Sequence, residues 1–300
     1  MIVHKSVMAN EVLEYLVPKT DNPIYVDCTT GEGGHTYLFL DKYKNLIAYG
    51  LDRDKDIQKK AIDRLECFAP RFIPVNTWFD TYLKDAETES VDLILIDLGI
   101  SIFHYVESNR GFSFRNDEKL DMRLDENQSY SAYNIVNEYA EEDIANIIFK
   151  YGEERYSRRI AKRIVEEREE KKIETSKELA DIIYHAVPRD YRYGKIHPAT
   201  RSFQALRIET NSELDRITPA LENAIRALRP GGRLAVITFH SLEDRIVKWL
   251  FKDFDKNNPN QIKILTKRPI IATDEELKEN PPSRSAKLRV IEKMEVGVWN

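Results

Sequence analysis

A glycine-rich turn is the first stretch of the sequence that could do chemistry. The residues "DCTTGEGGHTYL" place Gly31, Gly33 and Gly34 between an apolar, strand-like run and a helix-like run. Such a unit brings backbone N–H groups and a helix N-terminus close to a bound group. The glycine offsets differ from the G-x-G-x-x-G pattern of dinucleotide sites. A tight turn that binds nothing is the alternative interpretation.

Two carboxylates follow at the ends of later apolar runs. "GLDRD" places Asp52 eighteen positions after Gly34, where it can accept hydrogen bonds from both ribose hydroxyls of an adenosine-containing ligand. This spacing still fits NAD. Asp97 ends "VDLILIDLG" and puts an acidic group where a methyl donor and an acceptor could meet. Together with the "LRPGGRLAVITF" turn and strand, Asp97 favours S-adenosylmethionine, whose methionine carboxylate would face the glycine turn.

The elements that must position these residues alternate along the chain. Short β-branched runs at 24–30, 46–54, 71–76, 91–99 and 231–240 predict buried strands. Helical patterns fall at 7–16, 34–43, 55–67 and 211–229, the last with a restart at Pro219. Strands alternating with helices predict a parallel α/β sheet. Two final strands, at 262–270 and 287–296, are expected to run antiparallel to each other, instead of the second parallel half that a dehydrogenase needs.

A stretch of about a hundred residues breaks this alternation. Residues 106–207 contain helical patterns without a strand pattern, and one helix opens with a capping box from Thr175 to Glu178. We therefore predict an all-helical insertion at 106–207, within a discontinuous domain formed by residues 1–105 and 208–300. The predicted fold class is α/β, a class I (Rossmann-like) methyltransferase sheet with a helical insertion.

The composition of the chain limits which partners, metals and cellular locations we expect. The chain has 300 residues, 42% of them hydrophobic and 32% charged, and a net charge of -5. This balance argues mildly against nucleic-acid binding over the whole surface, so an RNA partner must meet local basic patches. Cys28 and Cys67 indicate no disulfide framework, and the six histidines have no metal-ligand spacing. With no signal peptide and no membrane-spanning run, we expect a cytoplasmic protein, as a monomer or homodimer.

Longer motifs carry a resemblance over nearly the whole chain. They include "GEGGHT" (31–36), "DLGIS" (97–101), "YGEERYSRRIA" (151–161), "HPATRSFQALRI" (197–208) and "FHSLEDRIVK" (239–248). In these stretches the chain resembles the bacterial small-subunit rRNA cytosine-N4-methyltransferase family, of the MraW or RsmH type. The resemblance implies transfer of a methyl group from S-adenosylmethionine to the exocyclic amine of a cytidine in the decoding region of 16S rRNA.

The resemblance also implies which residues contact the cofactor. "DLGISIFH" stands where the family pattern is close to "DLGVSSPQ", so His104 takes the position of a usual Gln. An ordinary loop histidine is the alternative for His104, and a core aromatic is the alternative for Phe79. The implied cofactor-binding residues are Gly33, Gly34, His35, Asp52, Phe79, Asp97 and His104.

A basic stretch near the end of the insertion is the expected RNA contact. Tyr191, Tyr193 and Phe203 are interleaved with its cations and could stack on an unpaired base, which the enzyme must take out of its stack to reach N4. A surface salt bridge is the alternative for each single arginine. The predicted RNA-binding residues are Arg110, Arg123, Arg189, Arg192, Lys195, Arg201, Phe203 and Arg207.

Asp97 is the candidate catalytic residue, because an acceptor near N4 can hold the amine and take its proton. It could equally serve only the cofactor. Methylation at cytosine C5 would need a cysteine nucleophile after a proline, which neither cysteine provides. Two alternatives from other classes stay open: a non-catalytic rRNA-binding assembly factor that kept the cofactor fold, and a nicotinamide enzyme.

Overall fold

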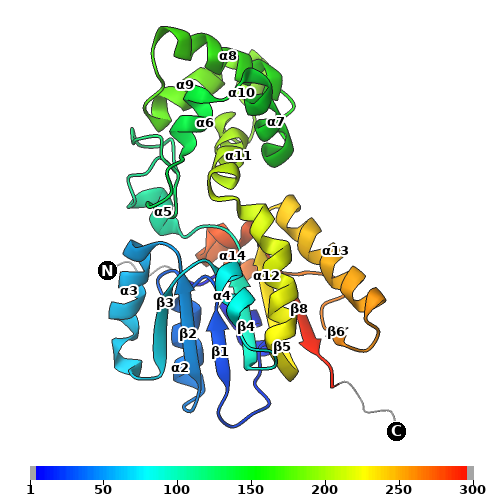
Figure 1. The fold of residues 1–300 in the computed structure, drawn as a ribbon. Helices are drawn as coiled ribbons and strands as arrows, with labels where there is room; N and C mark the ends of the chain where they lie inside the picture. Colours follow the sequence, from blue (N-terminus) through cyan, green and yellow to red (C-terminus); the bar gives the residue numbers. More distant parts are fainter. Residues whose placement is uncertain (1–4, 296–300) are drawn as a thin grey trace. The chain divides into compact units, whose positions relative to one another are not determined.

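A computed structural model describes residues 5–295, which form two compact units. One unit contains the residues up to Ile100 and those from Leu214 onward. Since it corresponds to the predicted methyltransferase domain, it is here called the methyltransferase unit. The other, the insertion unit, runs from Ser101 to Glu213 (Figure 1). Its limits lie a few residues outside the predicted 106 and 207, and Arg207 bonds to both Tyr105 and Glu213 within it.

The methyltransferase unit is built on one sheet, with strand order β3-β2-β1-β4-β5-β8-β6 and β7 paired to β8. The strands β1 to β5 run parallel, as the alternating pattern predicted, and β8 runs antiparallel to β5, β6 and β7. The strands are β1 (Ile24–Asp27), β2 (Ile47–Asp52), β3 (Phe72–Asn76), β4 (Val91–Asp97), β5 (Leu228–Thr238), β6 (Ile262–Ile264), β7 (Ile270–Ile271) and β8 (Lys287–Lys293).

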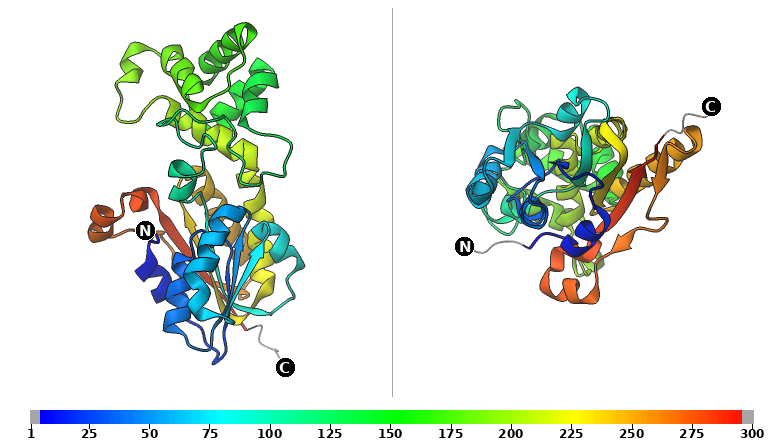
Figure 2. Two further views of the ribbon diagram at one scale, coloured as in Figure 1. Left: turned by 90° about the vertical axis from the view of Figure 1, so that its left-hand side faces the viewer. Right: turned by 90° about the horizontal axis from the view of Figure 1, so that it is seen from below.

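Helices cover both faces of this sheet, and the left view of Figure 2 shows the two layers. They are α1 (Ala9–Tyr15), α2 (Gly34–Lys42), α3 (Lys55–Leu65), α4 (Phe79–Asp85), α12 (Glu213–Ala227), α13 (Ser241–Asn257) and α14 (Asp274–Glu279), with short 3-10 turns at Glu66–Phe68 and Pro281–Ser285.

Successive strand residues point to opposite faces, so each strand supplies two cores. In β4, Ile94 and Ile96 pack with residues of α4, α12 and α13, whereas Leu93 and Leu95 pack with residues of α1, α2 and α14. All four side chains are at most 1% exposed. Burial on both faces explains why the strand reads as a continuous apolar run instead of alternating with polar residues.

Some predicted boundaries in this unit are wrong. The helix α12 runs through Pro219 without a restart. The first of the two predicted C-terminal strands is split into β6 and β7. Between them, the N–H of Leu265 donates to the carbonyl of Val290, and the Oγ1 of Thr266 accepts a hydrogen bond from the N–H of Val290. The antiparallel pairing of the C-terminal strands is confirmed. Val296, the last residue of the predicted second strand, lies outside the described residues.

The insertion unit consists of helices, as the sequence predicted. The capping box at Thr175 and Glu178 is present, and a second one joins Ser131 to Asn134. Gly152 allows close packing of α7 on α11, because a Cβ there would lie 2.6 Å from the carbonyl oxygen of Arg201. The helices are α5 (Ile102–Val106), α6 (Ala132–Glu138), α7 (Glu141–Gly152), α8 (Ser157–Glu170), α9 (Ser176–Ala186), α10 (Arg189–Arg192) and α11 (Ala199–Asn211).

Candidate active site

The glycine turn between β1 and α2 forms a tight cradle. Gly31 and Gly33 have φ angles of +55° and +78°, in the left-handed region that favours glycine. A Cβ at Gly33 would lie 2.9 Å from Leu65, and a Cβ at Gly34 would lie 2.1 Å from the hydroxyl of Ser6. Gly34 begins α2, so backbone N–H groups that the helix itself leaves unpaired face outward at this turn.

Asp52, at the end of β2, connects this glycine turn to the sheet by a hydrogen bond. Its Oδ2 accepts a hydrogen bond from the N–H of Gly31 at 3.0 Å, and its Oδ1 accepts one from the N–H of Asp54 at 2.9 Å. The predicted neighbourhood of Asp52 and the glycine turn is therefore present.

Asp27, at the end of β1, is a structural group that the sequence analysis did not single out. Its Oδ2 accepts a 2.7 Å hydrogen bond from the hydroxyl of Thr36 on α2, and the side chain is buried. Burial raises the pKa of Asp27 to about 6, although the hydrogen bonds of Thr36 and Thr29 oppose the rise. The threonine nine residues after an aspartate at a strand end is the signal that could have found this contact.

His35 and Asp97 meet at the carboxyl ends of the central strands. The Nε2 of His35 lies 3.7 Å from the Oδ2 of Asp97, and neither ring nitrogen of His35 has a hydrogen-bond partner in the described chain. Burial lowers the pKa of His35 to about 4, so the imidazole is neutral at pH 7. The backbone N–H of Asp97 is held by the Thr29 hydroxyl at 2.8 Å, which fixes the end of β4 beside the glycine turn.

Asp97 itself is an acid in an unusual environment. Its Oδ1 is buried and has no hydrogen-bond partner among the described residues. Burial raises the pKa of Asp97 well above the ordinary value, and the neighbouring carboxylates of Asp27 and Glu243 raise it further. A buried carboxyl with a shifted pKa at the edge where strand order reverses is a candidate functional group on physical grounds.

Glu243 is the third carboxylate near this edge. It is buried and belongs to a capping box, in which its Oε2 accepts hydrogen bonds from the N–H groups of Phe239 and His240. The Nδ1 of His240 in turn accepts from the N–H of Glu243, so both side chains hold the start of α13. The sequence suggested a site role for His240 and Ser241, and the structure gives His240 a helix-capping role.

Two other predicted cofactor contacts lie on separate elements. Phe79 begins α4, is partly buried and packs against the core on that side of the sheet. His104 lies on α5 of the insertion unit, where it is 4% exposed and packs between the rings of Phe103 and Phe112 at 5.4 and 5.3 Å. In the "ISIFH" stretch that departs from the family pattern, Phe103 and His104 are the buried residues of α5, and Ser101 is its N-cap.

The predicted RNA-binding residues divide into two groups. Arg110 donates to the carbonyl of Arg123, and Arg123 forms a two-point ion pair with Asp121. Arg207 is 8% exposed and pairs with both carboxylate oxygens of Glu213. These three arginines make contacts within the insertion unit, and their assignment as RNA contacts stays a prediction.

Phe203 and the remaining cations complete this division. Phe203 is 4% exposed and meets the ring of Phe114 edge-on at 5.0 Å, and its stacking on a base stays a prediction. Arg192 donates to the carbonyls of Val187 and His185, and Arg201 donates to that of Glu153. The cations left at the surface without an ion-pair partner in the described chain are Arg189 and Lys195, close to Tyr193, which is 72% exposed.

The residues at the strand ends fit S-adenosylmethionine. The glycine cradle admits backbone approach, and Asp97 offers an unsatisfied acceptor suited to a cationic ligand group. Asp52 ends β2 beside this cradle, and the neutral His35 can donate one hydrogen bond and accept another. Among residues 5–295, no helix is long and apolar enough to cross a membrane, and no group of three or more His, Cys, Asp or Glu side chains is placed to hold a metal.

Comparison with known proteins extends over the whole chain. A ribosomal RNA small subunit methyltransferase H from Treponema denticola is 52% identical, covering 98% of this chain and 98% of that protein. Proteins of the same name from Sulfurihydrogenibium sp. and Nostoc sp. are 50% and 48% identical, covering 97% of this chain and 99% and 92% of theirs. The family model described as the MraW methylase family matches residues 1–294. With the glycine cradle, Asp52 and Asp97 all inside the match, the chain belongs to the MraW methylase family.

Proposed function

We propose that this protein transfers a methyl group from S-adenosylmethionine to the exocyclic N4 amine of a cytidine in the decoding region of 16S rRNA. Full-length identity of about half to proteins named ribosomal RNA small subunit methyltransferase H supports the substrate class. The observation that carries the chemistry is the buried, unpartnered Oδ1 of Asp97 beside the glycine cradle. The reaction belongs to the cytoplasm, with the small ribosomal subunit as partner and the enzyme as a monomer or homodimer.

The cofactor would be held by residues from several elements. Gly33, Gly34 and His35 form the start of α2, Asp52 and Asp97 end two parallel strands, and Phe79 begins α4. His104 stands at the position where the family usually has a Gln contact, and we include it as a further proposed contact. When bound, S-adenosylmethionine supplies a methyl group already activated by the sulfonium, so the protein mainly has to orient the attacking nitrogen.

The chemistry left to the protein concerns the amine. The N4 lone pair of cytosine is delocalised into the ring, and an acceptor that holds the amine hydrogens favours a pyramidal, more nucleophilic nitrogen. The ionised carboxyl of Asp97 can hold one hydrogen and receive the proton that the methylated amine releases. Its raised pKa makes it a stronger base than an ordinary aspartate.

Methyl transfer to unmodified small subunits tests the proposal. Labelled S-adenosylmethionine would be incubated with subunits that lack the modification, followed by nucleoside analysis, with Asp97→Ala beside the wild type. We expect N4-methylcytidine from the wild type and at least a hundredfold less from Asp97→Ala, on the scale of general-base effects of about 10²–10⁴. Label in a different nucleoside would contradict the N4 assignment.

The same experiment distinguishes the proposed function from its main alternative, a non-catalytic assembly factor. A wild-type protein that binds S-adenosylmethionine and small subunits but leaves no label in rRNA would support the non-catalytic assembly factor. The "ISIFH" helix would then be the first place to restore the family pattern, by changing His104 to Gln.

A further inference from the structure

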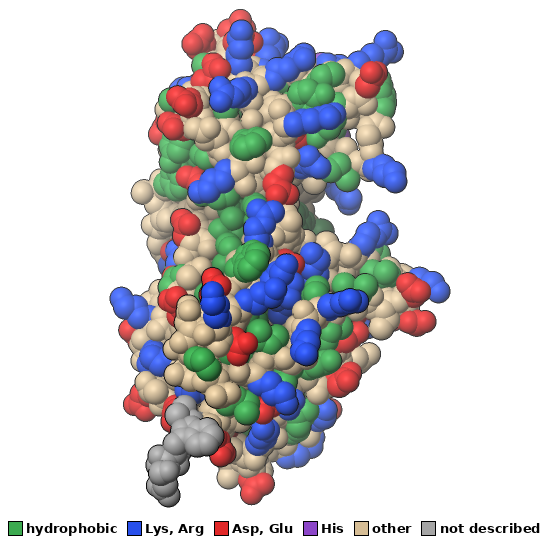
Figure 3. Space-filling view, turned by 90° about the vertical axis from the view of Figure 1, so that its right-hand side faces the viewer, with side chains coloured by type: hydrophobic (Ala, Val, Ile, Leu, Met, Phe, Trp, Pro, Cys, Tyr) green, Lys and Arg blue, Asp and Glu red, His purple; other side chains and the backbone are tan. Residues whose placement is uncertain are grey.

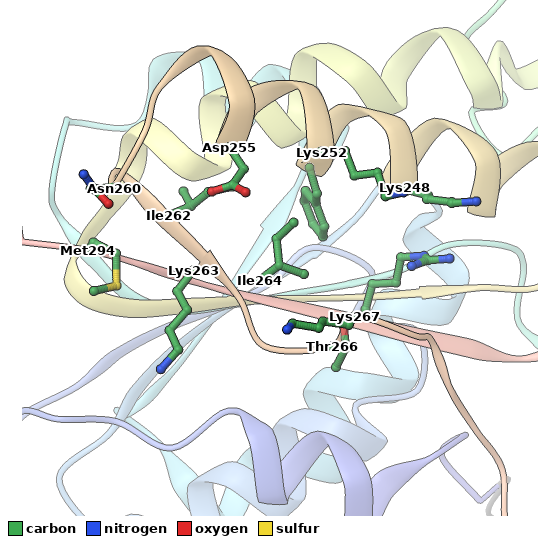
Figure 4. Close-up of a pocket in the computed structure, with 12 residues that line it drawn as sticks. Lys248, Lys252, Asp255, Asn260, Ile262, Lys263, Ile264, Thr266, Lys267 and Met294 are labelled. Carbon is green, nitrogen blue, oxygen red and sulfur yellow. The ribbon is translucent and has the colours of Figure 1, made fainter.

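A groove on the methyltransferase unit lies outside every residue discussed so far as a cofactor contact. It runs between α13 and the strands β6 and β8, and encloses about 570 Å³. Lys248 and Lys252 border it from the helix, and Lys263 and Lys267 from β6 and the turn that follows (Figure 4). Phe251, Ile262 and Ile264 supply apolar lining. We call this the basic groove.

The charge of the basic groove is strongly one-sided. Five of its twelve lining residues are Lys or Arg, and only Asp255 is acidic. Arg289 is neutralised by Asp244, whose Oδ1 accepts from its Nε at 2.7 Å. The four lysines have no carboxylate partner in the part of the chain that the structure describes. Figure 3 shows Lys and Arg side chains gathered on the face that carries this groove.

An exposed tryptophan stands next to these lysines. Trp249 lies between Lys248 and Lys252 on α13 and is 53% exposed. The ammonium groups of the two lysines lie 5.4 and 5.3 Å from the centre of its ring. A large aromatic surface flanked by cations, on a helix that borders a basic groove, is the combination that binds unpaired nucleotides, with stacking for a base and ammonium groups for phosphates.

Sheet-edge protection accounts for only part of this arrangement. Lysine on an edge strand such as β6 discourages pairing with another chain, so Lys263 has a use without any ligand. That role does not require Lys248 and Lys252 on the opposite wall, nor an exposed Trp249 beside them. The protein as a whole carries a net charge of -5, so a local concentration of unpaired lysines is a departure from its average surface.

We propose that the basic groove binds the phosphate backbone of the rRNA substrate, as a second RNA-binding site on the methyltransferase unit itself. This inference rests on the proposed function for the identity of the RNA. Its role is to hold a single-stranded segment of the RNA and so raise affinity, without contacting the reacting base. An acidic protein is the other polyanion that could fit, but it would make no use of the exposed ring of Trp249.

A matched pair of double variants tests the groove. Lys252→Gln/Lys263→Gln removes one exposed charge from each wall, and Lys59→Gln/Lys84→Gln removes two exposed charges on α3 and α4. Binding to small subunits and to a 16S rRNA fragment would be measured from 50 to 200 mM salt. We expect about tenfold weaker binding for the groove pair, and a slope of log affinity against log salt reduced by about 1.4, or roughly 0.7 for each lysine.

Further measurements separate this inference from folding and from the proposed function. The groove pair should keep its Tm, its S-adenosylmethionine affinity and its kcat at saturating subunits, while KM rises about tenfold. Because binding needs no methyl transfer, a wild type that fails to label rRNA would refute the proposed function and leave the binding result intact. Equal RNA affinity and equal salt slope for the groove pair and the control pair would overturn the proposal that the basic groove binds RNA.

Tryptophan fluorescence adds an independent test. RNA should quench the wild type and Trp78→Phe, and should leave Trp249→Phe unquenched, because Trp249 is the ring beside the groove. Quenching that persists in Trp249→Phe would overturn the placement of RNA along α13. Polyglutamate bound by the wild type in preference to the RNA fragment, and lost in Lys252→Gln/Lys263→Gln, would replace RNA by an acidic protein as the occupant.

Discussion

The Nε2 of His35 and the Oδ2 of Asp97 lie 3.7 Å apart, close enough to interact but too far for a hydrogen bond. Burial acts on both groups in the direction of neutrality, lowering the pKa of His35 to about 4 and raising that of Asp97 well above its usual range. The pair is therefore not a fixed salt bridge. Both side chains keep unused hydrogen-bonding capacity toward a third group, which is what a binding site for a polar cofactor requires.

The first prediction concerns the proton-accepting role of Asp97. Asp97→Asn keeps the shape but cannot take a proton, so kcat should fall at least a hundredfold and lose its rise with pH. In the wild type that rise should lie above the ordinary aspartate range, because the pKa of Asp97 is raised. Single-turnover rates at saturating S-adenosylmethionine would measure this. An unchanged pH profile with weaker cofactor binding would instead assign Asp97 to the cofactor alone.

The second prediction concerns the stability contributed by Asp27. Its pKa in the folded protein is raised to about 6, so its contribution to folding is complete below about pH 4 and is lost as the pH rises through 6. Asp27→Asn cannot ionise. The free energy of unfolding of Asp27→Asn relative to the wild type should therefore increase by about 3 kcal/mol between pH 4 and pH 7. Urea unfolding at a series of pH values would measure it.

The control for Asp27 is an aspartate on the surface. Asp63→Asn removes an exposed charge from α3 and should leave the pH dependence of stability close to that of the wild type. If Asp27→Asn and Asp63→Asn change with pH in parallel, burial is not what sets the titration of Asp27.

The sheet and the strand-end carboxylates could be predicted from sequence for a physical reason. A strand buried on both faces must be apolar throughout, so β4 stands out between turn residues, and its last position, Asp97, follows directly. The offset from Gly34 to Asp52 depends only on one helix and one strand of ordinary length. These features are local, and local rules were enough to place them.

The contacts of the arginines and of Phe203 could not be predicted in this way. Arg207 lies in a basic stretch, but its partner Glu213 comes six residues later, after the helix has ended, and Tyr105 comes from a distant part of the chain. Nothing in the composition of the stretch tells a buried ion pair from a surface cation. The aromatic neighbour of Phe203, Phe114, is equally distant in sequence. Tertiary structure decided these contacts.

The third prediction uses the close approach at the start of α2. A Cβ at Gly34 would meet the Ser6 hydroxyl at 2.1 Å, whereas the Ser6 Cβ would lie at 3.5 Å. Gly34→Ala should lower stability by about 1–3 kcal/mol and weaken S-adenosylmethionine binding, and adding Ser6→Ala should restore most of both. Gly33→Ala, with its φ of +78° and a contact to Leu65, should not be rescued by Ser6→Ala. Calorimetry of the four variants would decide, and failure of the rescue would show that Ser6 is not the obstacle.

The fourth prediction separates arginines that hold the insertion unit from cations that are free to bind RNA. Arg207→Ala leaves the largely covered carboxylate of Glu213 without its partner and should cost about 1–3 kcal/mol of stability. Arg189→Gln/Lys195→Gln removes two exposed charges without a partner in the described chain, so its Tm should stay within a degree or two. Its affinity for the rRNA fragment should instead fall severalfold and its salt dependence should flatten, because lost phosphate contacts release fewer counterions.

Thermal unfolding and RNA binding, measured on both variants, would test this prediction. Arg207→Ala should lose stability, whereas Arg189→Gln/Lys195→Gln should lose RNA affinity. An Arg189→Gln/Lys195→Gln protein with unchanged affinity would show that these two cations do not contact the RNA, and would shift the search to Tyr193 and the exposed residues around it.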